Sequence, residues 1–111
     1  MILHIVLYEP KPGLSEADMA QFSAVLLEAC ATIPSIRQVR SGKTIDLGLG
    51  FEHRSEGLEF RYVAIFEFES VDGLKDYLTH PAHAALAEQF WKHCERTMIL
   101  DVEAEDPKLP L

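Results

Sequence analysis

The segment from Phe60 to Phe68 constrains the fold of this chain more than any other segment. Aromatic residues and alanine occupy every second position, and the residues between them include Val63 and Ile65. Side chains alternate between the two faces of a β-strand, so this pattern predicts a strand with one aromatic face. The opposite face is also largely apolar, which predicts that both faces of the sheet are covered.

Further segments have the periodicity of strands or helices. Ser15 is expected to cap a helix, Ser70 begins a shorter one, and Pro81 suits the first turn of a third. The expected order is a strand over residues 2–8, a helix over 15–33, a strand over 36–45 with a bulge at Ser41-Gly42, a long loop over 47–57, a strand over 60–68, helices over 70–78 and 81–95, and a strand over 98–102.

This β-α-β-β-α-β order, with the second helical segment broken in two, predicts an α+β fold of the ferredoxin-like, split-βαβ type. Its four-stranded antiparallel sheet carries helices on one face only. The other face keeps large apolar side chains, and a monomer would expose them to water. Self-association into a homodimer is the expected way to cover that face.

Composition excludes several classes of partner. The 111 residues suit one domain, the formal net charge is -8, and the basic residues are scattered. Phosphate contacts need clustered cations, so nucleic acids and anionic membrane surfaces are disfavoured. We expect no secretory leader, because the apolar start lacks a basic flank, and no apolar run approaches the roughly 20 residues of a membrane span. Cys30 and Cys94 fit no zinc or redox spacing, which favours buried thiols in a cytoplasmic protein.

The motif His80-Pro81-Ala82-His83 places two histidines at the start of the last helix. His83 falls on the apolar stripe of that helix, together with Ala87, Phe90 and Cys94, whereas His80 only flanks its N-terminus. An imidazole aimed at the interior either finds a hydrogen-bond partner or takes part in chemistry.

The remaining histidines and the acidic residues give no sign of a metal or cofactor. We expect His53 and His93 to be solvated. Pro81 interrupts the helical register of His80 and His83, and no carboxylates cluster with them at ligand spacing. Phosphate-binding loops, nucleophile elbows and flavin fingerprints are not found either, so neither a metal nor a cofactor is expected.

Five segments, taken together and in order, have the pattern of a known family. They are Ile2–Leu7, Lys11–Ser15, Phe66–Ser70, Leu74–Tyr77 and His80–His83. With them the chain resembles the stress-responsive dimeric α/β-barrel (Dabb) family over about residues 1–102. The resemblance implies a homodimer whose two sheets face each other, and it leaves residues 103–111 as a tail on the surface or against the second protomer.

The resemblance also implies a site, because plant polyketide cyclases of this family work between the sheet and the helices. The residues at their catalytic positions are His4, Tyr77 and His83. His83 would act as the general base, Tyr77 would hydrogen-bond to His83 or to a substrate carbonyl, and His4 would orient a substrate oxygen or fix the tautomer of a partner. Tyr62 replaces a further histidine of the cyclases, and Cys94 replaces an aromatic pocket wall.

Two functions remain open at this point. The first is a small-molecule binding protein or cofactor-independent enzyme of the cyclase, lyase or monooxygenase kind. The second is a non-catalytic stress-response or interaction domain whose histidines only satisfy core hydrogen bonds. The first function requires that sheet and helices leave a pocket; its expected ligand-binding residues are Tyr62, Phe22, Leu26, Phe90 and Cys94.

Overall fold

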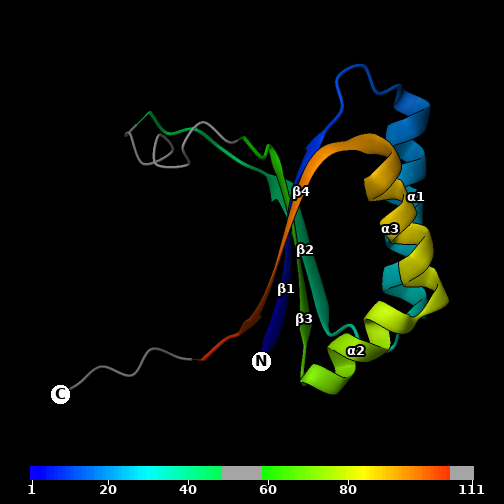
Figure 1. Ribbon diagram of the computed structural model, residues 1–111, viewed down its shortest axis with the longest axis vertical. Helices are drawn as coiled ribbons and strands as arrows, with labels where there is room; N and C mark the ends of the chain where they lie inside the picture. The colour runs from blue at the N-terminus through cyan, green and yellow to red at the C-terminus, as the bar shows by residue number, and fades with distance from the viewer. Residues whose placement is uncertain (49–58, 106–111) are drawn as a thin grey trace.

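The computed structural model describes residues 1–48 and 59–105, in which three helices lie against one face of a sheet (Figure 1). The expected loop over residues 47–57 and His53 lie almost wholly outside these ranges. In chain order the elements are β1 (Ile2–Pro10), α1 (Glu16–Thr32), β2 (Gln38–Lys43), β3 (Tyr62–Phe68), α2 (Val71–Thr79), α3 (Pro81–His93) and β4 (Cys94–Glu103).

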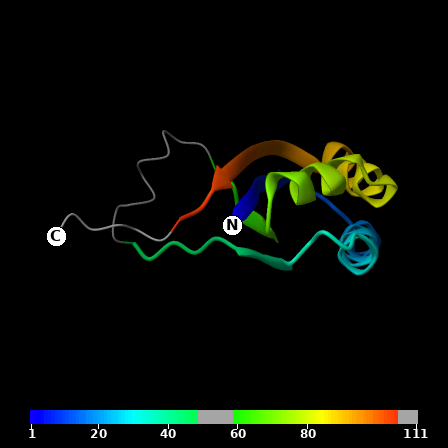
Figure 2. The same cartoon turned by 90° about the horizontal axis from the view of Figure 1, so that it is seen from below.

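The sheet has the order β2-β3-β1-β4, and every neighbouring pair is antiparallel. This is the predicted ferredoxin-like α+β arrangement, which is therefore confirmed. The view from below separates the sheet from the helices, all of which lie on the same side (Figure 2). Within the described residues, no helix is long and apolar enough to cross a membrane.

The three predicted helix starts are confirmed. Ser15 forms a capping box with Asp18, and the Ser70 hydroxyl accepts a hydrogen bond from the Gly73 N–H. Pro81 occupies the first turn of α3, as expected. His80 does more than flank this helix, because its Nδ1 accepts a hydrogen bond of 3.0 Å from the Ala82 N–H and caps α3.

The bulge predicted at Ser41-Gly42 is wrong. β2 pairs with β3 in unbroken register from Gln38 opposite Glu67 to Lys43 opposite Tyr62. Gly42 sits in regular extended backbone on an exposed edge strand, where a missing side chain leaves no gap. The irregularity of this sheet lies instead between Glu9 and Pro10, where β1 pairs with β4.

The predicted inward stripe of α3 is displaced by one position. The buried residues are Leu86, Gln89 and His93, whereas His83, Ala87 and Phe90 are half-buried. A prediction from apolar residues alone misses this row because two of its members are polar. His93, expected to be solvated, is only 4% exposed, so that prediction is wrong.

β4 begins earlier than predicted. The helix expected to reach residue 95 ends at His93, and Cys94 is already the first residue of β4 rather than part of the helical stripe. β1 is long enough to pair with β4 as far as Pro10 opposite Cys94. Because of this pairing, Cys94 and the residues that follow it belong to the sheet, although their local sequence is equally compatible with a helix.

The face of the sheet away from the helices is bare and apolar. By the register of the strands, it carries one set of alternating aliphatic side chains, of which Leu100 is 47% and Met98 40% exposed. The opposite face packs on the helices around the fully buried rings of Phe66 and Phe68. The apolar part of the bare face comprises Leu3, Ile5, Leu7, Val63, Ile65, Met98, Leu100 and Val102, and towards the β2 edge the same face carries Gln38, Arg40 and Glu67.

Candidate functional site

The interior between sheet and helices has two ends, and the first contains the three residues predicted to be catalytic. His4 comes from β1, Tyr77 from α2 and His83 from α3. The ring centroid of Tyr77 lies 5.5 Å from that of His4 and 4.7 Å from that of His83, and Phe66 packs against both His4 and Tyr77. We call the cluster of His4, Phe66, Tyr77 and His83 the closed end.

Asp101 is a member of this site that sequence reasoning missed. Its Oδ1 lies 2.6 Å from Nδ1 of His4, and it faces His4 directly across the β1–β4 pair. The His4 side chain is 4% exposed and that of Asp101 47%, so the carboxylate links a buried imidazole to solvent. The register of β1 against β4 is the signal that locates Asp101, and it is fixed only in the folded sheet.

The surroundings of His83 and Tyr77 keep both side chains uncharged near neutral pH. Burial lowers the pKa of His83, the neighbouring His4 lowers it further, and a hydrogen bond with the Leu78 backbone acts in the opposite direction. Burial likewise raises the pKa of Tyr77. A neutral imidazole accepts a proton and a neutral phenol donates a hydrogen bond, which are the two roles predicted for these residues.

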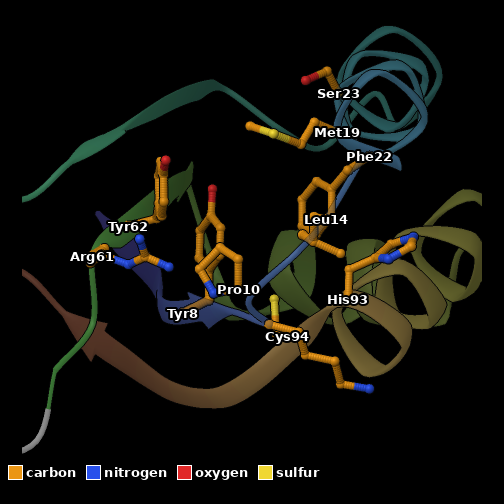
Figure 3. Close-up of a pocket in the computed structure, with 11 residues that line it drawn as sticks. Tyr8, Pro10, Leu14, Met19, Phe22, Ser23, Arg61, Tyr62, His93 and Cys94 are labelled. Atoms are coloured by element: carbon orange, nitrogen blue, oxygen red, sulfur yellow. The ribbon is translucent and has the colours of Figure 1, made fainter. Parts of the chain in front are cut away.

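The second end of the interior contains a cavity of about 260 Å³ between α1 and the far ends of β1 and β3 (Figure 3). The Tyr8 ring stacks between those of Tyr62 and Phe22, at centroid distances of 5.6 and 5.8 Å, and Phe90 meets it edge-on at 5.1 Å. We call this the open end. The cavity is lined by Tyr8, Pro10, Lys11, Leu14, Met19, Phe22, Ser23, Arg61, Tyr62, His93 and Cys94.

Ionisable groups at the open end are held by specific contacts. Arg61 donates to the buried Glu9 carboxylate from its backbone N–H, at 2.9 Å, and from Nε, at 2.5 Å. Burial would raise the pKa of Glu9, but these hydrogen bonds and the charge of Arg61 outweigh it and lower the pKa. Burial raises the pKa of the Cys94 thiol to about 11, so the thiol stays protonated and unreactive.

The predicted ligand-binding residues divide between the cavity and its surroundings. Tyr62, Phe22 and Cys94 line the cavity. Phe90 lies behind Tyr8 and Phe22, and Leu26 packs against the buried core. His4, Tyr77 and His83 are not among the lining residues.

Sequence reasoning missed five lining residues that bear polar groups: Tyr8, Lys11, Ser23, Arg61 and His93. Tyr8 shares a strand face with His4, and the alternation along β1 could have identified it. Lys11 lies in a connecting segment, whose placement no periodicity predicts. Arg61 was expected inside the strand over 60–68, but β3 begins only at Tyr62. His93 was missed because the prediction assigned the inward face of α3 to the neighbouring row of residues.

A packed layer separates the two ends. Tyr8 lies four residues beyond His4 on the same face of β1, roughly 13 Å away at about 3.3 Å per residue. Val6 and its register partner Ala64 lie between them, and Leu86 is buried with them. Within residues 1–48 and 59–105, no three His, Cys, Asp or Glu side chains gather in a way that could hold a metal ion.

The family model of the Stress Responsive A/B Barrel Domain (Dabb) matches residues 2–104 of this chain. The chain belongs to this family. The match spans every strand and helix described above, and it confirms the resemblance drawn from the sequence. Olivetolic acid cyclase of Cannabis sativa is 25% identical to this Dabb chain over 100 residues, which are 90% of the chain and 93% of the cyclase.

Solved structures of similar fold include an enzyme and a protein of unknown function. Hydroxynitrile lyase from Passiflora edulis superposes with a TM-score of 0.75 at 25% identity, over 96% of each chain. A dimeric ferredoxin-like protein of unknown function from Thermobifida fusca gives 0.70 at 21% identity, over 93% of this chain and 90% of that one. The second similarity concerns the fold alone.

Proposed function

We propose that this Dabb protein binds a small apolar ligand bearing a carbonyl or phenol group in the cavity at its open end. The cavity itself carries the proposal. Its walls are mainly aromatic and aliphatic, with the hydroxyls of Tyr8, Tyr62 and Ser23 among them. Small-molecule sites combine apolar walls with a few polar groups in this way.

The size of the cavity limits the ligand. A dry protein cavity of roughly 150 Å³ holds benzene, so about 260 Å³ accommodates one substituted aromatic ring. The rings of Tyr62, Tyr8 and Phe22 are stacked in a row and form one aromatic wall, against which the ligand ring packs.

We further propose an acid–base reaction at the closed end. In this reaction His83 removes a proton from a carbon beside the ligand carbonyl, and the Tyr77 hydroxyl donates a hydrogen bond to the enolate oxygen. His4, held by Asp101, orients that oxygen. This step needs no cofactor.

A ligand that uses both ends has to be elongated. It would place a ring at Tyr8 and displace the packed layer beside Ala64, the smallest side chain in that layer, to bring a carbonyl towards His83. Relatives named as a cyclase and a lyase support the catalytic part of the proposal, because both names denote enzymes.

Two titrations followed by NMR test binding and catalysis separately. Acetophenone should shift the resonances of Tyr8, Phe22 and Tyr62, and Cys94→Phe should abolish this binding by filling the cavity, while Cys94→Ser should retain it. Absence of these shifts in the unmodified protein would contradict the binding proposal and favour the non-catalytic interaction domain.

The catalytic part is tested by hydrogen exchange at carbon. In D₂O, the protein should incorporate deuterium into the methyl group of 6-phenylhexan-2-one, whose chain is long enough to pass Ala64. His83→Gln should lose this exchange, and His80→Asn, which keeps the helix cap, should not. Exchange that is equal in the unmodified protein and in His83→Gln would exclude His83 as the base.

We also propose that the protein is a homodimer through the bare face of its sheet. A monomer would expose this continuous apolar surface, and the Thermobifida fusca protein of the same fold is dimeric. Light scattering at micromolar concentration should give the dimer mass, and Leu100→Lys should reduce it to the monomer mass. A monomer mass for the unmodified protein would contradict the proposal.

A further inference from the structure

We propose that the open-end cavity selects ligands that carry a carboxylate group, which Arg61 and Lys11 bind at the rim while the apolar body of the ligand lies against Tyr8 and Phe22. This inference rests on the proposed ligand-binding function and specifies the chemical class of the ligand.

The charge of the cavity is opposite to that of the molecule. The chain has 18 acidic and 10 basic residues, giving a net charge of -8. Among the described residues no acidic residue lines the cavity, whereas Lys11 and Arg61 both do. A site built only for a neutral ligand gains nothing from two cations at its rim, and an anionic ligand gains from both.

Arg61 is positioned before any ligand arrives. Its Nε and backbone N–H are both occupied by Glu9, whose side chain is 8% exposed. A guanidinium has five N–H donors, and among the described residues no hydrogen bond occupies its two terminal nitrogens. The terminal nitrogens therefore remain for a second carboxylate, in the geometry that arginine favours.

Lys11 approaches the cavity from the segment between β1 and α1. Its backbone N–H donates to the His93 carbonyl at 2.8 Å, which fixes this segment against the end of α3. The positive charge of Lys11 acts on the Cys94 thiol by lowering its pKa against the effect of burial. Lys11 is also one of the residues that line the cavity, so its positive charge lies at the cavity rim.

The acidic groups near Arg61 do not cancel this preference. Glu9 and Glu59 both interact with Arg61, but Glu9 also interacts with Arg96, and Glu59 is exposed to screening by water and salt. Glu9, the buried one of the two acids, therefore faces two arginines, and Lys11 adds a further positive charge at the rim.

A matched pair of probes isolates the carboxylate, because benzoate and benzamide have nearly the same shape and differ in charge. Calorimetric titration at low salt should show benzoate binding about tenfold more tightly than benzamide, and this preference should shrink as salt is added. Both Lys11→Gln and Arg61→Gln should reduce the preference, and Arg37→Gln, which changes an exposed arginine paired with Glu69, should leave it intact.

Each outcome of these titrations either supports or overturns the preference for a carboxylate. Equal binding of the two probes would overturn this inference and leave the proposed ligand-binding function standing, whereas binding of neither would overturn both. Arg61→Gln removes the partner of Glu9 and can weaken folding, so its melting curve is recorded alongside. Lys11 is exposed and has no such role, and an unchanged preference in a folded Lys11→Gln protein with benzoate still bound would remove Lys11 from the site.

Discussion

The two ends of the interior are built on the same three strands, yet they are packed in different ways. At the closed end, the buried rings of Phe66 and Tyr77 fill the space, and the imidazole of His4 is paired with Asp101. At the open end, the rings of Tyr8 and Phe22 stand 5.8 Å apart and leave a cavity beside them.

The side chains of α1 change between the two ends in the same direction as the packing. Ala29, near the C-terminus of α1, is completely buried, and Ile33, just after the helix, is nearly so. Towards its N-terminus the residues facing the sheet are larger and only partly buried, as for Phe22. Small side chains bring a helix close to a sheet, and bulky aromatic ones hold it away. The comparison suggests that binding is favoured where packing is incomplete and that the acid–base groups are held where packing is tight.

The largest expected effect on the unfolding free energy comes from two single variants, each of which removes a phenylalanine ring at one end. Phe66→Ala should cost about 3–5 kcal/mol of unfolding free energy, because the Phe66 ring is fully buried and its loss leaves a cavity. Phe22→Ala should cost about half as much or less, because this ring already borders a cavity. Chemical denaturation at matched protein concentration measures both. Equal losses would show that the two ends do not differ in packing.

A smaller effect is expected from the hydrogen bond between His4 and Asp101 at the closed end. Asp101→Ala should cost about 1–3 kcal/mol, because it leaves Nδ1 of the buried His4 without a partner. Asp101→Asn should recover part of this loss, since the amide oxygen still accepts a hydrogen bond. Glu103→Ala, an exposed change on the same strand, serves as the control. If Glu103→Ala lost as much unfolding free energy as Asp101→Ala, this role for Asp101 would be contradicted.

The smallest effect is the pH dependence that His83 adds to stability. Its pKa is lower in the folded protein than the ordinary value of 6.5, so the unfolded chain takes up a proton first as the pH falls. Stability should therefore decrease as the pH drops below 6.5 and stop decreasing below the folded pKa, with no contribution from His83 above this window. Histidine resonances in NMR give the midpoint directly, and a His83 midpoint above 6.5 would contradict the burial of this ring.

The sequence was informative about the closed end and much less so about the open end. Alternation along β3 and the proline at the start of α3 placed Phe66 and His83, and the capping serines placed the helices that carry Tyr77 and Phe22. These features are local, so a single chain segment specifies each of them.

The open end depends on features that no local pattern specifies. His93 is buried because α3 turns one row of residues inward, and the apolar pattern of the helix alone favoured the row that includes Phe90. Arg61 lines the cavity because Glu9, far away in sequence, holds it there. The cavity is itself a mismatch of side-chain volumes across three elements, and such a mismatch leaves no periodicity in a sequence.

A crystal structure of the protein soaked with acetophenone would test the central claim most directly. The account predicts electron density for one aromatic ring beside Tyr8 and Phe22 in the open-end cavity, with His4, Tyr77 and His83 unmoved at the closed end. An unoccupied cavity at saturating acetophenone, or one filled by rearranged side chains of Leu14 and Met19, would contradict it.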